Sequence, residues 1–268
     1  MNNPFSEVTN MDDIVRSLNP NYTPTDTNNA PLMPQHKGFE GPPRVIITGA
    51  SGIGKTNSIL GAITARQIKA DHIWLCTGSP NQMKYKTFMK IMNTLQKQMS
   101  EQIGEEYSLY TLITEPEQLP EMEELDTSIS HLCLIDDMVS KKNQQWFEDA
   151  FIKARNFNMG LIYITQDFYK VSPIIRRNCN YFMIFKPNSK TDVDLLTAEH
   201  SLVHKEHFKE IFNKATEDKH SFLFLDKRTD IPLLRIRKNF NQVWVDEEND
   251  FVPIQKLLQN NPDILQEK

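Results

Sequence analysis

The chain has 268 residues, which is long enough for one or two domains, and its 39% hydrophobic and 24% charged content is ordinary for a globular protein with a buried core. The net charge is −5, from 30 basic and 35 acidic residues, which argues against a protein that wraps nucleic acid with a broad basic face. The charge leaves open a ring that contacts a polyanion only along a narrow channel.

The sequence shows no signal for export or membrane insertion and no cysteines at metal-binding spacing. No charged and apolar leader is visible, and no apolar run approaches the roughly 18–20 residues that cross a bilayer. Cys76, Cys133 and Cys179 are far apart and lack the spacing of zinc ligands. We therefore expect a protein that is not secreted, has no transmembrane segment, disulfide or structural zinc, and works in a reducing compartment.

Residues 1–40 are rich in Asn, Pro and Thr and show no hydrophobic periodicity, apart from one short helix candidate at 11–18. This composition predicts a flexible N-terminal arm. The alternative is a docking segment for a partner or a neighbouring subunit.

The region 41–240 alternates between strand-like apolar runs and helix-like patterns. The runs are RVIIT (44–48), HIWLCTG (72–78), HLCLID (131–136), LIYITQ (161–166), YFMIFK (181–186), SFLFLD (221–226) and LLRIRK (233–238). Continuous runs of this kind are typical of parallel strands that are covered on both faces. Apolar residues recur at helical spacing in 84–99 and 145–155. The alternation predicts an α/β domain with a mainly parallel central sheet flanked by helices, the last two strands forming an antiparallel edge.

Residues 241–268 are acidic and polar and are predicted to form a C-terminal tail, with one short helix near 252–259. The sequence shows no internal repeat.

A glycine-rich loop, GASGIGKT at 49–56, lies between the first strand-like run and a helix expected over 55–69. It matches the phosphate-binding pattern GxxxxGK[ST], in which glycines let backbone N–H groups surround an anion at a helix N-terminus. Lys55 is expected to reach the β- and γ-phosphates, and Thr56 to place its hydroxyl on Mg²⁺. A purely structural turn is the alternative. The nucleotide-binding residues predicted here are Gly49, Ala50, Ser51, Gly52, Ile53, Gly54, Lys55, Thr56 and Asn57.

Two further strand ends carry polar groups suited to nucleotide hydrolysis. The run at 131–136 ends in Asp136, predicted to hold Mg²⁺, and Asp137 follows as the candidate that activates a water. The run at 161–166 ends in Gln166, which fits a sensor of the γ-phosphate. In P-loop ATPases that use an acid-activated water, the strand with this polar tip lies between the loop strand and the Asp strand. We predict that order here.

In this order, the three signals resemble the FtsK/HerA superfamily of ring ATPases. The closest likeness is to the genome-packaging ATPases of large double-stranded DNA viruses of the poxvirus type, and of virophages. The matching stretches VIITGASGIGKT, HLCLIDDM and GLIYITQDFYKVSPIIRRNCNYFMIFK cover about residues 44–186. The resemblance implies a RecA-like P-loop ATPase domain over 41–240, with Asp137 as the catalytic acid and Gln166 as the sensor. Most members of the wider superfamily carry Glu at the position of Asp137.

The resemblance also implies an arginine finger, because ring ATPases insert an arginine of one subunit into the neighbour's nucleotide site. Arg155 is the first candidate for this finger, and Arg176 or Arg177 the second. Arg155 also suits a helix C-terminus without any catalytic role. Lys84, Lys86 and Lys90 are candidates for DNA contacts, although charged helix residues are usually only solvated.

The function that these features favour is an ATP- and Mg²⁺-dependent motor that moves double-stranded DNA, packaging a viral genome into a preformed capsid. The expected assembly is a homo-oligomeric ring, a pentamer or hexamer, working with a capsid or portal-vertex protein in the host cytoplasm or viral factory or associated with the virion. Two alternatives stay open: a P-loop small-molecule kinase, and a nucleotide-controlled assembly scaffold. Neither an arginine-rich lid, a guanine-reading NKxD motif nor an LSGGQ motif is visible.

Overall fold

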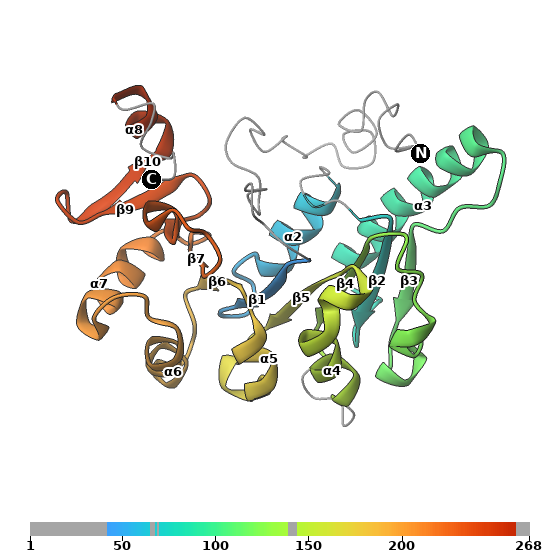
Figure 1. The fold of residues 1–268 in the computed structure, drawn as a ribbon, viewed down its shortest axis with the longest axis horizontal. Coiled ribbons are helices and arrows are strands. Elements are labelled where there is room, and N and C mark those ends of the chain that lie inside the picture. The colour runs from blue at the N-terminus through green and yellow to red at the C-terminus, as the bar shows by residue number, and fades with distance from the viewer. Residues whose placement is uncertain (1–41, 65–67, 69, 139–143, 261–268) are drawn as a thin grey trace.

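The computed structural model of the chain describes residues 42–64, 68, 70–138 and 144–260. Within these residues the fold is one ten-stranded sheet covered by helices on both faces (Figure 1). The predicted arm at 1–40 and the end of the predicted tail lie outside this part of the chain. The strands are β1 Arg44–Thr48, β2 His72–Thr77, β3 Tyr110–Ile113, β4 His131–Asp136, β5 Met159–Thr165, β6 Tyr181–Phe185, β7 Phe222–Asp226, β8 Ile236–Lys238, β9 Gln242–Val245 and β10 Asp250–Pro253.

The order of the strands is β10-β9-β8-β7-β6-β1-β5-β4-β2-β3. Strand β5 pairs in parallel with β1 on one side and with β4 on the other, which confirms the predicted position of the extra strand. The strands from β6 to β3 in this order are parallel, whereas β7, β8, β9 and β10 are antiparallel to their neighbours. The α/β fold with a mainly parallel centre and an antiparallel edge is therefore confirmed.

Helices cover the two faces of the sheet in separate groups. Figure 1 shows α2 and α3 on one face and α4, α5, α6 and α7 on the other. Successive strand residues alternate between the two layers, because side chains along a strand point to opposite faces: Ile46 packs on the α4 side, and its neighbours Val45 and Ile47 on the α2 side. The helices are α2 Lys55–Thr64, α3 Met83–Ile103, α4 Gln145–Lys153, α5 Pro173–Asn178, α6 Lys190–His200, α7 Lys205–Ala215 and α8 Ile254–Asn260.

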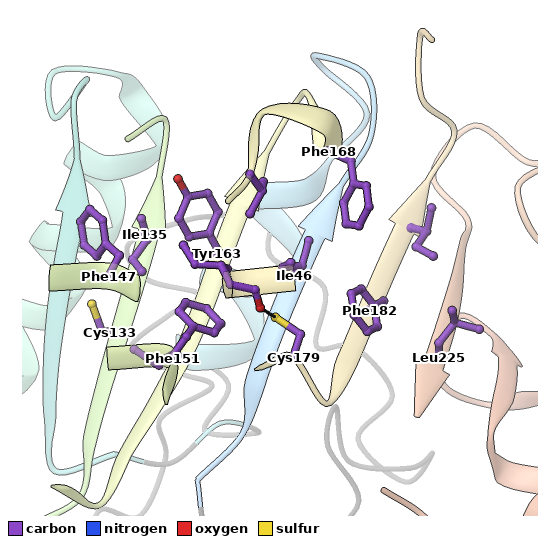
Figure 2. Close-up of a cluster of buried hydrophobic side chains, with 14 of the residues drawn as sticks. Ile46, Cys133, Ile135, Phe147, Phe151, Tyr163, Phe168, Cys179, Phe182 and Leu225 are labelled. Carbon is purple, nitrogen blue, oxygen red and sulfur yellow. Dashed lines mark hydrogen bonds between the residues drawn. The ribbon is translucent and has the colours of Figure 1, made fainter. Parts of the chain in front are cut away.

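The core under α4 and α5 is rich in aromatic side chains (Figure 2). Phe147 and Phe151 of α4 pack against Tyr163 of β5, with ring centroids 6.4 Å apart in both pairs. Cys133 and Cys179 lie in the same cluster, and the thiol of Cys179 donates to the carbonyl of Ile175. All three cysteines are buried and free, so they contribute to packing as small apolar groups.

Residues 242–253 lie in the sheet, although the sequence assigns them to a tail. Strand β9 pairs with β8, and β10 pairs with β9. The acidic residues between the two strands hide the apolar ones: Val243, Trp244 and Val252 are buried, while Asp246, Glu247 and Glu248 are exposed. The predicted boundary at 240 therefore cuts through the sheet. The sequence also misses β3, a short edge strand whose residues are mostly half-buried.

His200, at the end of α6, is a buried ionisable group in this core. It is 3% exposed, and its ring lies 4.1 Å from that of Phe182 and 5.8 Å from that of Phe168. Burial lowers the pKa of His200 to about 4, because the apolar surroundings disfavour the charged imidazolium.

We predict that His200 makes the stability depend on pH between about 6.5 and 4. An unfolded histidine has a pKa of about 6.5. Between these values the unfolded chain binds a proton that the folded chain does not, so the free energy of unfolding falls as the pH falls, by up to about 3 kcal/mol. Urea unfolding at a series of pH values from 7 to 4 measures this loss of stability, with His200→Phe as the control for other titrating groups. Parallel pH curves for the two proteins would contradict the prediction.

Candidate nucleotide-binding and hydrolysis site

The predicted phosphate-binding loop joins β1 to α2, with Lys55 as the first residue of the helix. Gly49, Gly52 and Gly54 have φ angles of 148°, 73° and 102°, a region that favours glycine. A Cβ on Gly49 would lie 2.6 Å from the Cβ of Phe185, because the loop runs against the end of β6. The Ala50 N–H donates to the carbonyl of Lys186 at 3.0 Å and fixes that approach.

Lys55 is turned back onto its own loop. Its Nζ donates to the carbonyls of Gly49 at 2.7 Å and Ala50 at 2.6 Å, and the residue is 7% exposed. Burial lowers the pKa of Lys55, an effect that the nearby Asp136 and Asp137 oppose. Of the other loop residues, Ser51, Gly52 and Asn57 are exposed, and Ala50, Ile53 and Gly54 are half-buried.

Thr56 and Asp136, the two predicted Mg²⁺ ligands, lie next to each other. The Thr56 hydroxyl donates to Oδ2 of Asp136 at 2.7 Å, and both residues are buried. The two residues come together because parallel strands end at one edge of a sheet: Thr48 of β1 is in register with Thr165 of β5, and Asp136 of β4 with Ile164. One hydroxyl and one carboxylate are hard oxygen ligands that suit Mg²⁺, which is commonly held by one or two carboxylates together with phosphate oxygens and waters.

Asp137 and Gln166 form the second pair at this edge. The side chain of Gln166 lies close enough to the Asp137 carboxyl group to lower its pKa, an effect smaller than those of burial and Asp136, which raise it. Asp137 has a φ of 57°, in the left-handed region, which turns the chain sharply at the end of β4. Burial, followed by the charge of Asp136, raises the pKa of Asp137 above its usual range. A carboxylate with a raised pKa is a better proton acceptor for a water near neutral pH.

Two residues of α3 belong to the site and are missed as site residues by the sequence reading. The Tyr85 hydroxyl donates to Oδ2 of Asp136, and the Lys84 ammonium lies 3.0 Å from the Thr56 hydroxyl and 3.4 Å from the same Oδ2. Burial raises the pKa of Tyr85, so the phenol keeps its proton and acts as a donor. Tyr85 continues the apolar stripe of α3 at helical spacing and is easily taken for a core residue.

His220 is a further residue next to the loop. Its Nδ1 lies 3.1 Å from the carbonyl of Ile53, although it precedes β7 and is 167 residues away in the chain. No sequence pattern marks it, because only the pairing of β7 with β6 brings it there.

The candidate arginines lie at the opposite edge of the sheet. Arg155, in the short 3-10 helix Ala154–Phe157, precedes the start of β5, and Arg177 precedes the start of β6; both are exposed. Burial lowers the pKa of Arg44, at the start of β1, and the nearby charge of Arg155 adds a smaller effect in the same direction. Arg176 instead is 6% exposed and forms two hydrogen bonds with Glu199, at 2.9 and 2.8 Å.

The three candidate DNA-contacting lysines separate in the structure. Lys84 points into the site, whereas Lys86 and Lys90 are exposed on α3. Only the latter two have the exposure that a contact with a DNA backbone requires.

Comparison with protein-family models finds a family that matches most of the chain. Residues 35–227 match the family model described as the poxvirus A32 protein, which spans more than half of the chain and includes every site residue named above. The chain belongs to the poxvirus A32 protein family. No curated protein sequence matches it significantly.

Several solved structures are similar to this member of the A32 family. The genome packaging NTPase B204 from Sulfolobus turreted icosahedral virus 2, in complex with AMP, is 16% identical with a TM-score of 0.47, over 70% of this chain and 93% of that one. B204 from Sulfolobus turreted icosahedral virus, a DNA-packaging ATPase, is 16% identical with a TM-score of 0.46, over 68% and 91%. EccC of Thermomonospora curvata (ATPases 2 and 3) is 15% identical with a TM-score of 0.41, over 70% and 35%.

We predict that Gly49→Ala destabilises the loop. The new Cβ would meet Phe185, and the backbone angle is costly for alanine, so we expect the free energy of unfolding to fall by about 2 kcal/mol and nucleotide affinity to fall at least about tenfold. Urea unfolding and titration with a fluorescent ATP analogue measure the two effects. Gly61→Ala in α2, where a Cβ meets nothing within 4 Å, is the matched control and should bind like the wild type. Equal binding by both variants would contradict the prediction.

Proposed function

We propose that this protein is an ATPase that hydrolyses ATP at the edge formed by β1, β5 and β4, and that it uses the energy to move double-stranded DNA during packaging of a viral genome. The observation that carries the proposal is the meeting of Lys55, Thr56, Asp136, Asp137 and Gln166 at one edge of the sheet. Membership of the A32 family agrees with the resemblance of the motifs to the packaging branch of ring ATPases.

The loop and the start of α2 supply the phosphate site. The N-terminus of α2 favours negative charge, and Lys55 is free to exchange its two carbonyl partners for phosphate oxygens. Thr56 and Asp136 would hold Mg²⁺. When bound, Mg²⁺ neutralises charge on the β- and γ-phosphate oxygens.

Asp137 and Gln166 supply the hydrolytic step. Asp137 accepts a proton from the attacking water, and Gln166, which lies near its carboxyl group, positions that water and the γ-phosphate relative to each other. Asp137 is one methylene shorter than glutamate, and its backbone is in the left-handed region directly after the end of β4.

The arginines support a site completed by a neighbouring subunit. Arg155 and Arg177 lie at the N-terminal edge of strands β5 and β6, and crossing strands of five to seven residues takes roughly 15–20 Å. Neither side chain reaches the nucleotide site of its own chain, whereas head-to-tail contacts in a ring would bring one of them to the next subunit. Arg155 is our first candidate, and Arg177 the second, since Arg176 is held by Glu199.

The remaining parts of the proposal concern assembly and location. A homo-oligomeric ring, a pentamer or hexamer, would act with a capsid or portal-vertex protein in the host cytoplasm or viral factory. No helix of the described residues is long and apolar enough to cross a membrane.

The first test is ATP hydrolysis with and without double-stranded DNA. We expect DNA of any sequence to stimulate hydrolysis, and high salt to remove the stimulation, because the contacts are to phosphates. Asp137→Asn should bind ATP and hydrolyse it at least about 100-fold more slowly. Asp194→Asn, an exposed carboxylate on α6 paired with Lys209, is the control and should behave like the wild type. Hydrolysis that ignores DNA would refute the motor, and full activity of Asp137→Asn would refute the assigned acid.

The second test concerns the arginine finger. Arg155→Ala should bind ATP normally and lose at least about 100-fold in hydrolysis, because a positive charge opposite the transferring phosphate is removed. Mixing it with Asp137→Asn subunits should restore part of the activity, since some interfaces then combine an intact acid with an intact arginine. Arg177→Ala is the matched comparison. Normal turnover by Arg155→Ala together with loss in Arg177→Ala would transfer the role to Arg177.

A further inference from the structure

Lys84 lies inside the site, although the phosphate-binding loop pattern does not include this lysine. Its Nζ lies 3.0 Å from the Thr56 hydroxyl and 3.4 Å from Oδ2 of Asp136, and those two oxygens are 2.7 Å apart. The ammonium thus contacts the same two oxygens that would hold Mg²⁺. Its side chain is 25% exposed, so the contact is shielded from bulk solvent.

The charge of Lys84 lies at an end of α3 where the helix itself disfavours a cation. Lys84 is the second residue of α3, a helix of 21 residues, and a cation is disfavoured at a helix N-terminus. The contact with Asp136, and the placement of Nζ 4.8 Å from the Tyr85 ring centroid, offset this cost. Lys86, in the same turn, is exposed, so the direction of Lys84 follows from the site and not from the helix alone.

Lys84 also balances the charge of the carboxylates. Lys55 donates to loop carbonyls and makes no contact with Asp136 within 4.0 Å among the described residues, so Lys84 is the cation bonded to that carboxylate. An ammonium has three donors and no acceptor, and it competes with a metal ion for the same oxygen lone pairs. Two cations on one pair of oxygens repel each other strongly at such a short range.

We infer that Lys84 is a tethered competitor of Mg²⁺, which holds the Thr56–Asp136 pair until a nucleotide brings the metal and draws the ammonium away. Its four-carbon stem allows Nζ to move while α3 stays in place. The competition would keep the metal affinity of the site low without nucleotide and couple metal binding to phosphate binding. This inference rests on the proposed function in one respect, that residues 49–56 bind a nucleotide.

The test is binding of a fluorescent ADP analogue to the full chain, titrated with Mg²⁺ and repeated in EDTA. In Lys84→Met the Mg²⁺ concentration at half-saturation should fall about tenfold, because the competing cation is removed. Lys84→Arg, which keeps the charge, and Lys86→Met, which removes a charge from the same turn, should stay within about twofold of the wild type. Lys84→Gln gives the same test with a polar side chain if methionine disturbs the packing around Asp136.

The outcomes separate the inference from the proposed function. An unchanged Mg²⁺ midpoint in both Lys84→Met and Lys84→Gln would overturn the competition. If Lys84→Met and Lys84→Gln bound the analogue more weakly than the wild type in EDTA but kept its Mg²⁺ midpoint, the competition would be overturned too, and Lys84 would be a phosphate ligand. If wild type and Lys55→Ala bound the analogue equally, the proposed nucleotide site would fail and the inference with it.

Discussion

The insertion of β5 between β1 and β4 is the constraint on which the rest of the structure depends. It separates the strand that leads into the phosphate-binding loop from the strand that ends in Asp136. Its own tip then carries Gln166 to the Asp137 carboxyl group. The hydrogen-bonded register keeps all three strand ends level, so groups that are about 30 to 110 residues apart in the chain converge without any dedicated loop.

Around Asp136 the site concentrates charge in a buried setting. A hydroxyl, a phenol and an ammonium all contact one carboxylate oxygen, and a second carboxylate follows in the chain. Bringing a carboxylate out of water is costly unless its oxygens are hydrogen-bonded. One of these donors, the Lys84 ammonium, contacts the two oxygens proposed to hold Mg²⁺, so the group that helps to offset this cost is also the one proposed to exchange with the metal.

The parallel sheet also keeps two groups of candidate residues at opposite edges. Its carboxyl edge gathers the residues proposed to bind and hydrolyse the nucleotide, and its amino edge carries the exposed Arg155 and Arg177. One subunit alone leaves these groups apart, and a head-to-tail neighbour would join them. The aromatic layer under α4 and α5, shown in Figure 2, forms the packed body between the two edges.

The sequence by itself determined the loop, the Asp136–Asp137 pair, the Gln166 tip and the α/β class, because these depend on local patterns: apolar runs, glycines and polar strand ends. It also led to the position of β5, through the order of the motifs. Only the tertiary structure decided that Lys84 and Tyr85 contact Asp136, that Arg176 is held by Glu199, and that residues 242–253 join the sheet. These outcomes depend on which strands and helices become neighbours, and a lysine, an arginine or a polar strand looks the same in a sequence whether it faces water or a buried carboxylate.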